Sequence, residues 1–315
     1  PSPHSSPMFE QTQRQVDHDI QQSMDLFRRA KVGSVSPIQP LVPKRVLVAL
    51  DGSAQDELSA AIANQLQARL NCELAVVDAT ETSGRTVDIP EPLQAASSLD
   101  AIDDDSYEQI VVAAADWNAE LVIVPCPFGR DFETIGADST GTVIDVLLAR
   151  LPMPLIATRA PFDPAGDVFS RLRMVLTGEN EAARAAAQWA AGLVHPEGHL
   201  ELMLEVEGEF FENVREAMQS VHPDAEVSIE SLESALAKTH ARLHVGLQQA
   251  AAAGGFDYGL SIHRQSEAEP FTVNDPAAHP PLLVLALERA DSASQGHVHS
   301  RIRRSPHPVL VVSVD

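Results

Sequence analysis

Short continuous runs of aliphatic residues alternate with longer segments of helical spacing along most of the chain. In the first part, aliphatic runs predict strands at 45–50 (RVLVAL), 72–79 (CELAVVDA), 120–125 (ELVIVP) and 154–159 (PLIATR). Apolar residues three or four positions apart predict helices over 53–70, 106–118 and 140–151. Because each strand is a continuous apolar run, the pattern indicates a parallel sheet covered by helices on both faces. The segment 80–104 is too short for a full helix and strand, so this half is expected to be trimmed.

The same order of elements returns in the second half of the chain. Strands are predicted at 172–179, 199–207, 225–230, 281–287 and 308–314, with an additional strand at 256–263. Helices are predicted at 180–194, 210–221 and 231–253, and through 298–304. The two ends also match, since LPMPLIATR and SPHPVLVVS share a Pro-x-Pro followed by aliphatic residues. A repeat of this length indicates two copies of one domain rather than one large sheet.

These patterns divide the chain into an N-terminal arm and two domains. The arm spans 1–44 and has a disordered start, an amphipathic helix over 8–31 and a proline-rich linker. Domain 1 spans 45–160, a second linker spans 161–170, and domain 2 spans 171–315. The arm helix either packs on the chain or a sister subunit, or docks on a membrane or target helix. Its polar face lacks the dense Lys and Arg of interfacial helices, which favours packing.

Composition narrows the classes of partner. The chain has 315 residues, 44% of them hydrophobic, and 45 Asp and Glu against 22 Lys and Arg, a formal charge of −23. Such a surface repels phosphate backbones and anionic lipids, so neither nucleic acid nor a membrane is expected as a partner. Two cysteines, Cys72 and Cys126, indicate a reducing compartment, and they fall at opposite ends of the predicted sheet. No export signal or membrane-spanning run is visible, so a cytoplasmic location is expected.

Several ordered motifs resemble the universal stress protein family in its tandem two-domain form. They are RVLVALDGS, a second strand that ends VVDA, ELVIVPCPFG followed by GTVIDVLLARLPMPLIATR, and GHVHSRIRRSPHPVLVVSV. The resemblance covers about residues 45–160 and 171–315. It implies an α/β fold of two Rossmann-like, doubly wound domains, each with a five-stranded, mostly parallel sheet. It also implies that the final strands of the two halves pair as an internal pseudo-dimer, and that the chain forms a homodimer.

The resemblance also implies a nucleotide site in domain 1. The family's ATP-binding members use an acidic residue after the first strand, backbone groups after the second, and a G-x2-G-x9-G-[ST] loop after the fourth. On this chain these positions and their neighbours are Asp51, Gly52, Ser53, Val77, Cys126, Gly129, Gly141, Thr142 and Val143. The implied cofactor is ATP or another adenine nucleotide, with no metal beyond the Mg²⁺ that accompanies it. Ligands of such sheets bind where the strand order reverses, and glycines let backbone N–H groups approach phosphates.

The loop after the fourth strand departs from the family pattern. Cys126 replaces the first glycine, and eleven residues rather than nine separate Gly129 from Gly141. Pro125 and Pro127 remove N–H donors. The anion-binding end is kept, but the loop that leads to it is rebuilt.

Two further expectations concern Asp51 and its counterpart in the repeat. Ser53, with Asp56 three residues on, has the spacing of a helix cap, which would leave the Asp51 carboxylate unused by the turn and available to a ligand. In the second half Thr177 stands at the position of Asp51, and Glu288 would repel a phosphate. Domain 2 is therefore expected to be structural or to differ in ligand.

Other chemistries are less favoured by the residues. His240 and His244, four apart on a helix, and the group His297, His299 and His307 could bind zinc, but no cysteine lies near them in sequence. The acidic run 103–105 is typical of a helix start. A phospho-acceptor receiver domain would need several carboxylates around Mg²⁺ and a lysine opposite Asp51, and Lys44 lies at the wrong end of the strand.

Two hypotheses of function remain. In the first, the protein is a stress-response regulator that binds adenine nucleotide in domain 1. In the second, it is a nucleotide-free scaffold that recruits an unknown protein partner, with domain 2 purely structural. Neither hypothesis makes it an enzyme, because no catalytic base or nucleophile is identifiable, although weak ATP hydrolysis stays open.

Overall fold

The computed structural model describes residues 37–80, 87–102, 104–129, 140–159, 166–176, 178–207, 238, 240–265 and 282–314. Every statement below concerns these residues. The helices predicted over 8–31 and 210–221, the strand predicted at 225–230 and Thr177 lie outside them.

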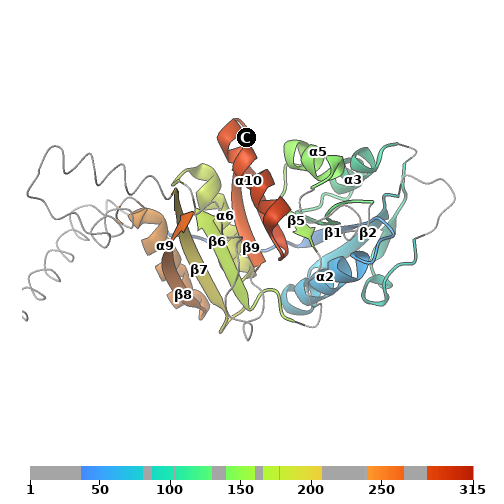
Figure 1. The fold of residues 1–315 in the computed structure, drawn as a ribbon. Helices are drawn as coiled ribbons and strands as arrows, with labels where there is room; N and C mark the ends of the chain where they lie inside the picture. The colour runs from blue at the N-terminus through green and yellow to red at the C-terminus, as the bar shows by residue number, and fades with distance from the viewer. Residues whose placement is uncertain are drawn as a thin grey trace, which may run out of the picture. The chain divides into compact units, whose positions relative to one another are not determined.

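The strands form one sheet in the order β3-β2-β1-β4-β5-β10-β9-β6-β7-β8 (Figure 1). The strands of the first half are β1 (Arg45–Leu50), β2 (Glu73–Asp78), β3 (Ser97–Leu99), β4 (Leu121–Pro125) and β5 (Leu155–Thr158). Those of the second half are β6 (Arg171–Leu176), β7 (His199–Glu207), β8 (Asp257–Gln265), β9 (Leu282–Glu288) and β10 (Val309–Val314). All pairs within a half are parallel, which confirms the predicted fold class.

The two halves join through their last strands. β10 pairs with β5 in antiparallel register, with Val309 opposite Ala157 and Val311 opposite Leu155. The sequence predicted this pairing of final strands, but it also predicted two sheets rather than one, and that part is wrong. The pairing covers two aliphatic strand edges at once, so ten strands form one continuous sheet.

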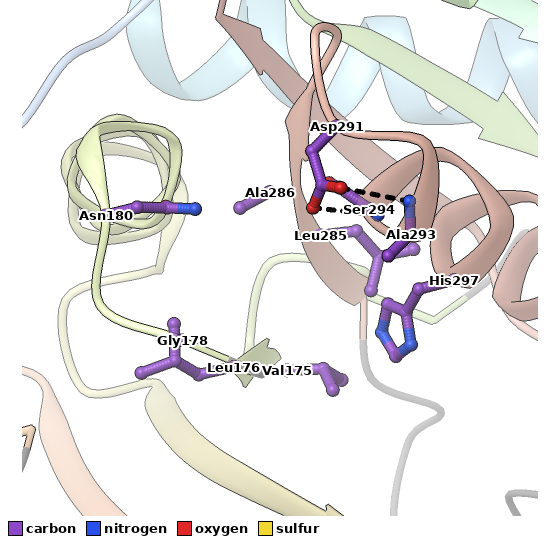
Figure 2. Close-up of a pocket in the computed structure, with 10 residues that line it drawn as sticks. All are labelled: Val175, Leu176, Gly178, Asn180, Leu285, Ala286, Asp291, Ala293, Ser294 and His297. Carbon is purple, nitrogen blue, oxygen red and sulfur yellow. Dashed lines mark hydrogen bonds between the residues drawn. The ribbon is translucent and has the colours of Figure 1, made fainter.

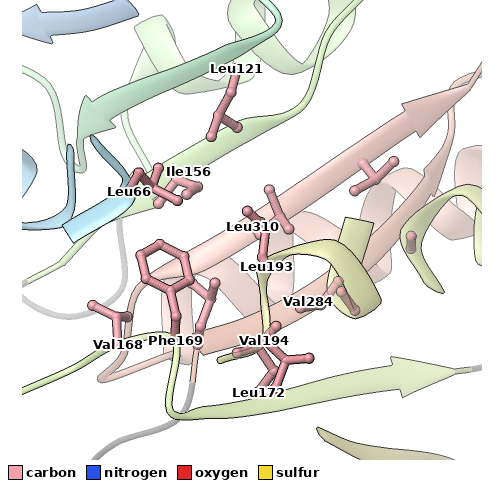
Figure 3. Packing of buried hydrophobic residues seen from close by; sticks show 14 of the residues in the cluster. Leu66, Leu121, Ile156, Val168, Phe169, Leu172, Leu193, Val194, Val284 and Leu310 are labelled. Atoms are coloured by element: carbon pink, nitrogen blue, oxygen red, sulfur yellow. The ribbon is translucent and has the colours of Figure 1, made fainter. Parts of the chain in front are cut away.

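Helices cover both faces of this sheet. One buried apolar cluster contains residues of α2 (Asp56–Leu70), α6 (Glu181–Leu193) and α9 (Ala241–Gly254). The other contains residues of α3 (Ser106–Asp116), α5 (Thr142–Arg150) and α10 (Ser292–Arg304). The first cluster crosses the junction between the halves, with Ile156 of β5 and Leu310 of β10 both in it (Figure 3).

Two predictions about individual elements need adjustment. The described part of 80–104 contains a single 3₁₀ turn, η1 (Glu91–Leu93), before the three-residue strand β3, so this half does have a third strand, although a short one. The additional strand expected at 256–263 is β8, which pairs with β7 over its whole length and takes the place that β3 has in the first half.

The residues before β1 pack on helices of the second half, where the sequence predicts a proline-rich linker. Ile38 is buried in the first cluster, and Leu41 N donates to the Gln188 carbonyl at 2.9 Å. Two helical glycines permit this contact. A Cβ at Gly192 would lie 1.8 Å from the Leu41 carbonyl oxygen, and one at Gly246 would lie 2.7 Å from Ile38 Cγ1. The end of the predicted linker is therefore a packed segment.

We expect Gly192→Ala to lower the free energy of unfolding by about 1–3 kcal/mol, because the added methyl group displaces the backbone of Leu41. The matched control is Gly296→Ala in α10, where a Cβ meets nothing within 4 Å. It should raise stability by about 0.5–1 kcal/mol, since alanine favours a helix over glycine. Urea-induced unfolding of both variants checks this, and equal gains in stability would contradict the packing of this segment.

Candidate functional site

In the first half the strand order reverses between β1 and β4, and two predicted residues meet at that point. Asp51 follows β1, and Gly129 lies in the loop after β4. Gly129 N donates to Asp51 Oδ2 at 2.6 Å, and Ser53 N donates to Asp51 Oδ1 at 2.8 Å. The Asp51 side chain is 8% exposed. Its carboxylate therefore holds the turn after β1 against the loop after β4, at the position where ligands bind in sheets of this kind.

The turn after β1 differs from the predicted cap. Helix α2 begins at Asp56, its N-cap residue is Gln55, and Ser53 Oγ accepts only from Gln55 N at 3.2 Å. The Asp56 carboxylate instead accepts from Asp51 N at 3.1 Å and from Gly52 N at 2.9 Å. The expectations that Ser53 caps the helix and that the turn does without Asp51 are both wrong, because the two carboxylates share the backbone N–H groups of this turn.

Asp56 is a residue of this site that sequence reasoning missed. It is buried, and burial raises the pKa of its carboxyl to about 7, with the charge of Asp51 as the second cause. Two carboxyl groups held this close ionise together only at a cost. A signal was present in the sequence, since a second acid five residues after Asp51 falls at the helix start.

The start of α5 provides the second part of the site. Gly141 is its N-cap residue with φ of +77°, a conformation that favours glycine, and a Cβ there would lie 3.7 Å from Pro127 Cβ. No side chain of the described residues caps this helix end. Thr142 and Val143 are its first two residues, and their N–H groups carry the partial positive charge of a helix start.

An acid lies in the first turn of α5 as well. Thr140 Oγ1 donates to Asp145 Oδ1 at 2.9 Å, and His299 Nδ1 of α10 lies 3.0 Å from the same oxygen. The second half thus contributes a side chain to the edge of the first half's site. Sequence reasoning missed this contact, because 154 positions separate the two residues and no local pattern joins them.

The remaining predicted residues lie in the core. Val77 is fully buried one residue before β2 ends and pairs with Ala49, so its side chain lies in the core. Cys126 is also fully buried, and Arg159 Nη1 donates to its Sγ at 3.2 Å. Burial raises the pKa of the Cys126 thiol, whose side chain lies in the core.

The second half has its own reversal of strand order, between β6 and β9, and a cavity of about 220 Å³ lies there (Figure 2). Its lining is Val175, Leu176, Gly178, Asn180, Leu285, Ala286, Asp291, Ala293, Ser294 and His297. Unlike α5, both helices that begin here are capped by side chains. Asn180 Oδ1 accepts from Ala183 N at 2.8 Å, and Asp291 accepts from the N–H groups of Ala293 and Ser294.

The histidines considered as metal ligands have other neighbours. His244 Nδ1 lies 2.9 Å from the Tyr258 hydroxyl, and burial, followed by the charge of Arg173, lowers the pKa of His307 to about 4. No group of three or more metal-binding side chains occurs among the described residues. Within the same residues, no helix combines the length and apolar character needed to cross a bilayer.

Comparisons with known proteins agree at the level of structure. The chain matches no protein-family profile and no curated protein sequence. A universal stress protein from Archaeoglobus fulgidus superposes with a TM-score of 0.51, at 14% identity, over 85% of this chain and 96% of its own. The fold is that of the universal stress proteins. A functionally unknown protein from Pseudomonas aeruginosa has the same fold, with a TM-score of 0.53 at 13% identity over 87% of this chain and 93% of its own.

The raised pKa of Asp56 has a consequence for stability. Its value of about 7 in the folded chain lies above the ordinary 3.8, so the protonated carboxyl stabilises the fold at low pH, and this contribution is lost as pH rises towards 7. We expect Asp56→Asn to reduce the fall in melting temperature between pH 5 and 8 by a few degrees. The control, Asp88→Asn at an exposed position, should leave that fall unchanged. Thermal unfolding with identical slopes in all three proteins would contradict the assignment.

Proposed function

We propose that this protein is a stress-response regulator that binds an adenine nucleotide in its first half. The observation that carries the proposal is the Asp51–Gly129 hydrogen bond across the β1–β4 reversal, beside a helix start that no described side chain caps. The base and ribose would lie at Asp51 and the backbone of Val77. The phosphates, with their Mg²⁺, would lie at Gly129, Gly141 and Thr142.

The hydrogen bonds of the turn suggest how a nucleotide would enter. The Asp51 carboxylate accepts the Gly129 N–H at 2.6 Å, so this donor has a partner within the chain. A phosphate oxygen is an equally strong charged acceptor and can take over the N–H. The carboxylate would then be released towards a ribose hydroxyl. Binding would exchange one charged acceptor for another and would leave no buried donor unpaired.

The proposed role is binding rather than turnover. Activation of a water needs an accessible base. The Asp56 carboxyl is 4% exposed and engaged by two backbone N–H groups, and the half-exposed Asp145 carboxylate is engaged by the Thr140 hydroxyl and by His299.

A nucleotide-free scaffold is the second candidate, and one observation favours it. Both oxygens of Asp51 are already engaged, and Asp145 adds a negative charge to the first turn of α5, where a phosphate would sit. In that role the acidic surface would recruit a protein partner, and the Asp51 contacts would be purely structural.

Calorimetry with ATP, ADP and AMP in the presence of Mg²⁺ separates the two candidates. The nucleotide hypothesis predicts saturable heat, with ATP affinity at least about tenfold lower in Gly141→Ala, because a Cβ at positive φ strains the start of α5. Gly255→Ala is the matched control, since Gly255 also has positive φ, with open space around it in the second half. Its nucleotide affinity should equal that of the parent. If no nucleotide gives heat at millimolar concentration, the nucleotide hypothesis is rejected and the scaffold hypothesis is kept.

A further inference from the structure

The cavity of the second half has a polar rim that is already hydrogen-bonded. Asn180 Nδ2 donates to Glu288 Oε2 at 2.9 Å, and Glu288 N donates to Ser294 Oγ at 3.0 Å. Asp291 in turn accepts from Ser294 N at 3.2 Å. These contacts run from the start of α6, past the end of β9, to the start of α10. Figure 2 shows the last of them, between Asp291 and the first turn of α10.

Three backbone donors at the two helix starts already have side-chain acceptors. Two N–H groups at the start of α10, those of Ala293 and Ser294, point to the Asp291 carboxylate at 3.0 and 3.2 Å. At the start of α6, Ala183 N is satisfied by Asn180. A phosphate at this position would compete with the Asp291 carboxylate for both of these donors. The start of α5 in the first half has no such side-chain cap among the described residues.

The charges around the cavity favour a cation. Asp291 lines the cavity, and Glu288 is bonded to the lining residue Asn180. Glu205 is a neighbour of His297, with 3.9 Å between Glu205 Oε2 and His297 Nε2. The charge of Glu205 is balanced by an ion pair with Arg301. Burial lowers the pKa of His297, which disfavours the charged form of this ring beside the cavity.

The rest of the lining limits the size and character of the occupant. Val175, Leu176, Leu285 and Ala286 contribute apolar surface at the ends of β6 and β9. The volume of the cavity is about 220 Å³. This is smaller than the pockets of roughly 300 Å³ and more that hold drug-sized ligands. A compact molecule with one polar end fits such a space.

We propose that this cavity binds a small organic cation, a molecule with one ammonium group and a short aliphatic body. The ammonium group lies at the Asp291 carboxylate and the Ser294 hydroxyl, and the aliphatic body lies on Leu176, Leu285 and Ala286. The site is separate from the proposed nucleotide site and does not depend on it, because it uses the other half's strand reversal.

Three probes with the same branched carbon skeleton test the charge preference, namely isopentylamine, isopentyl alcohol and isovalerate. Each is titrated into the full chain in an amine-free buffer and followed by protein NMR. We expect saturable shifts with isopentylamine at millimolar concentration or below, weaker binding of the alcohol, and none of the carboxylate. Asp291→Asn keeps the helix cap, since asparagine caps as well as aspartate. It should weaken the amine about tenfold, because a hydrogen bond to a charged group is lost.

The control for that variant is Asp100→Asn, which removes one exposed charge from the first half and should leave amine binding unchanged. The proposal is overturned if isovalerate binds better than the amine, if Asp291→Asn binds the amine as well as the parent does, or if no probe gives saturable shifts. Calorimetry with ATP measures nucleotide binding in the first half by a separate experiment. A failure of amine binding is therefore distinguished from a failure of nucleotide binding.

Discussion

The antiparallel pairing of β5 with β10 is the contact on which the arrangement of both halves depends. It is short, with three residue pairs from Val309–Ala157 to Val311–Leu155, yet it turns two five-stranded units into one sheet. Arg159, which is fully buried at the end of β5, stabilises the β5–β10 pairing through hydrogen bonds to the segment before β10. Its Nε donates to the Ser305 carbonyl and its Nη2 to the Arg303 carbonyl, both at 3.1 Å, where α10 leads into β10. With the sheet joined in this way, α5 and α10 lie on the same face, and His299 can reach Asp145.

The two halves show how one fold can present opposite chemistry at equivalent positions. In the first half a glycine with positive φ begins the helix after the fourth strand, and no described side chain caps that helix. In the second half Asp291 is the N-cap residue of the corresponding helix and accepts from the N–H groups of Ala293 and Ser294. One helix start is therefore suited to an anionic ligand and the other is not, although both follow a buried parallel strand. The difference rests on a single position in each half, Gly141 against Asp291.

Most of the fold was predictable from sequence because its strands are buried on both faces and appear as uninterrupted apolar runs, as RVLVAL does. The local hydrogen bonds were less predictable. Ser53 and Asp56 match the spacing of a helix cap, but the pattern cannot tell which polar side chain turns inward, and here Asp56 is the buried one. The contact between Asp145 and His299 depends on the joined sheet and has no local signal. The packing of Leu41 on α6 was hidden for a related reason, since a glycine within a helix does not identify what approaches it.

Helix α10 takes part in both halves of the molecule. His297 lines the cavity of the second half, and His299, two residues further along the same helix, contacts Asp145 in the first turn of α5. Any displacement of α10 would therefore reach both the cavity of the second half and the Asp145 contact of the first. The joining of two repeats in one chain therefore has a structural consequence for both halves. It places one helix against the candidate sites of both halves, so that a substitution in α10 can alter either of them.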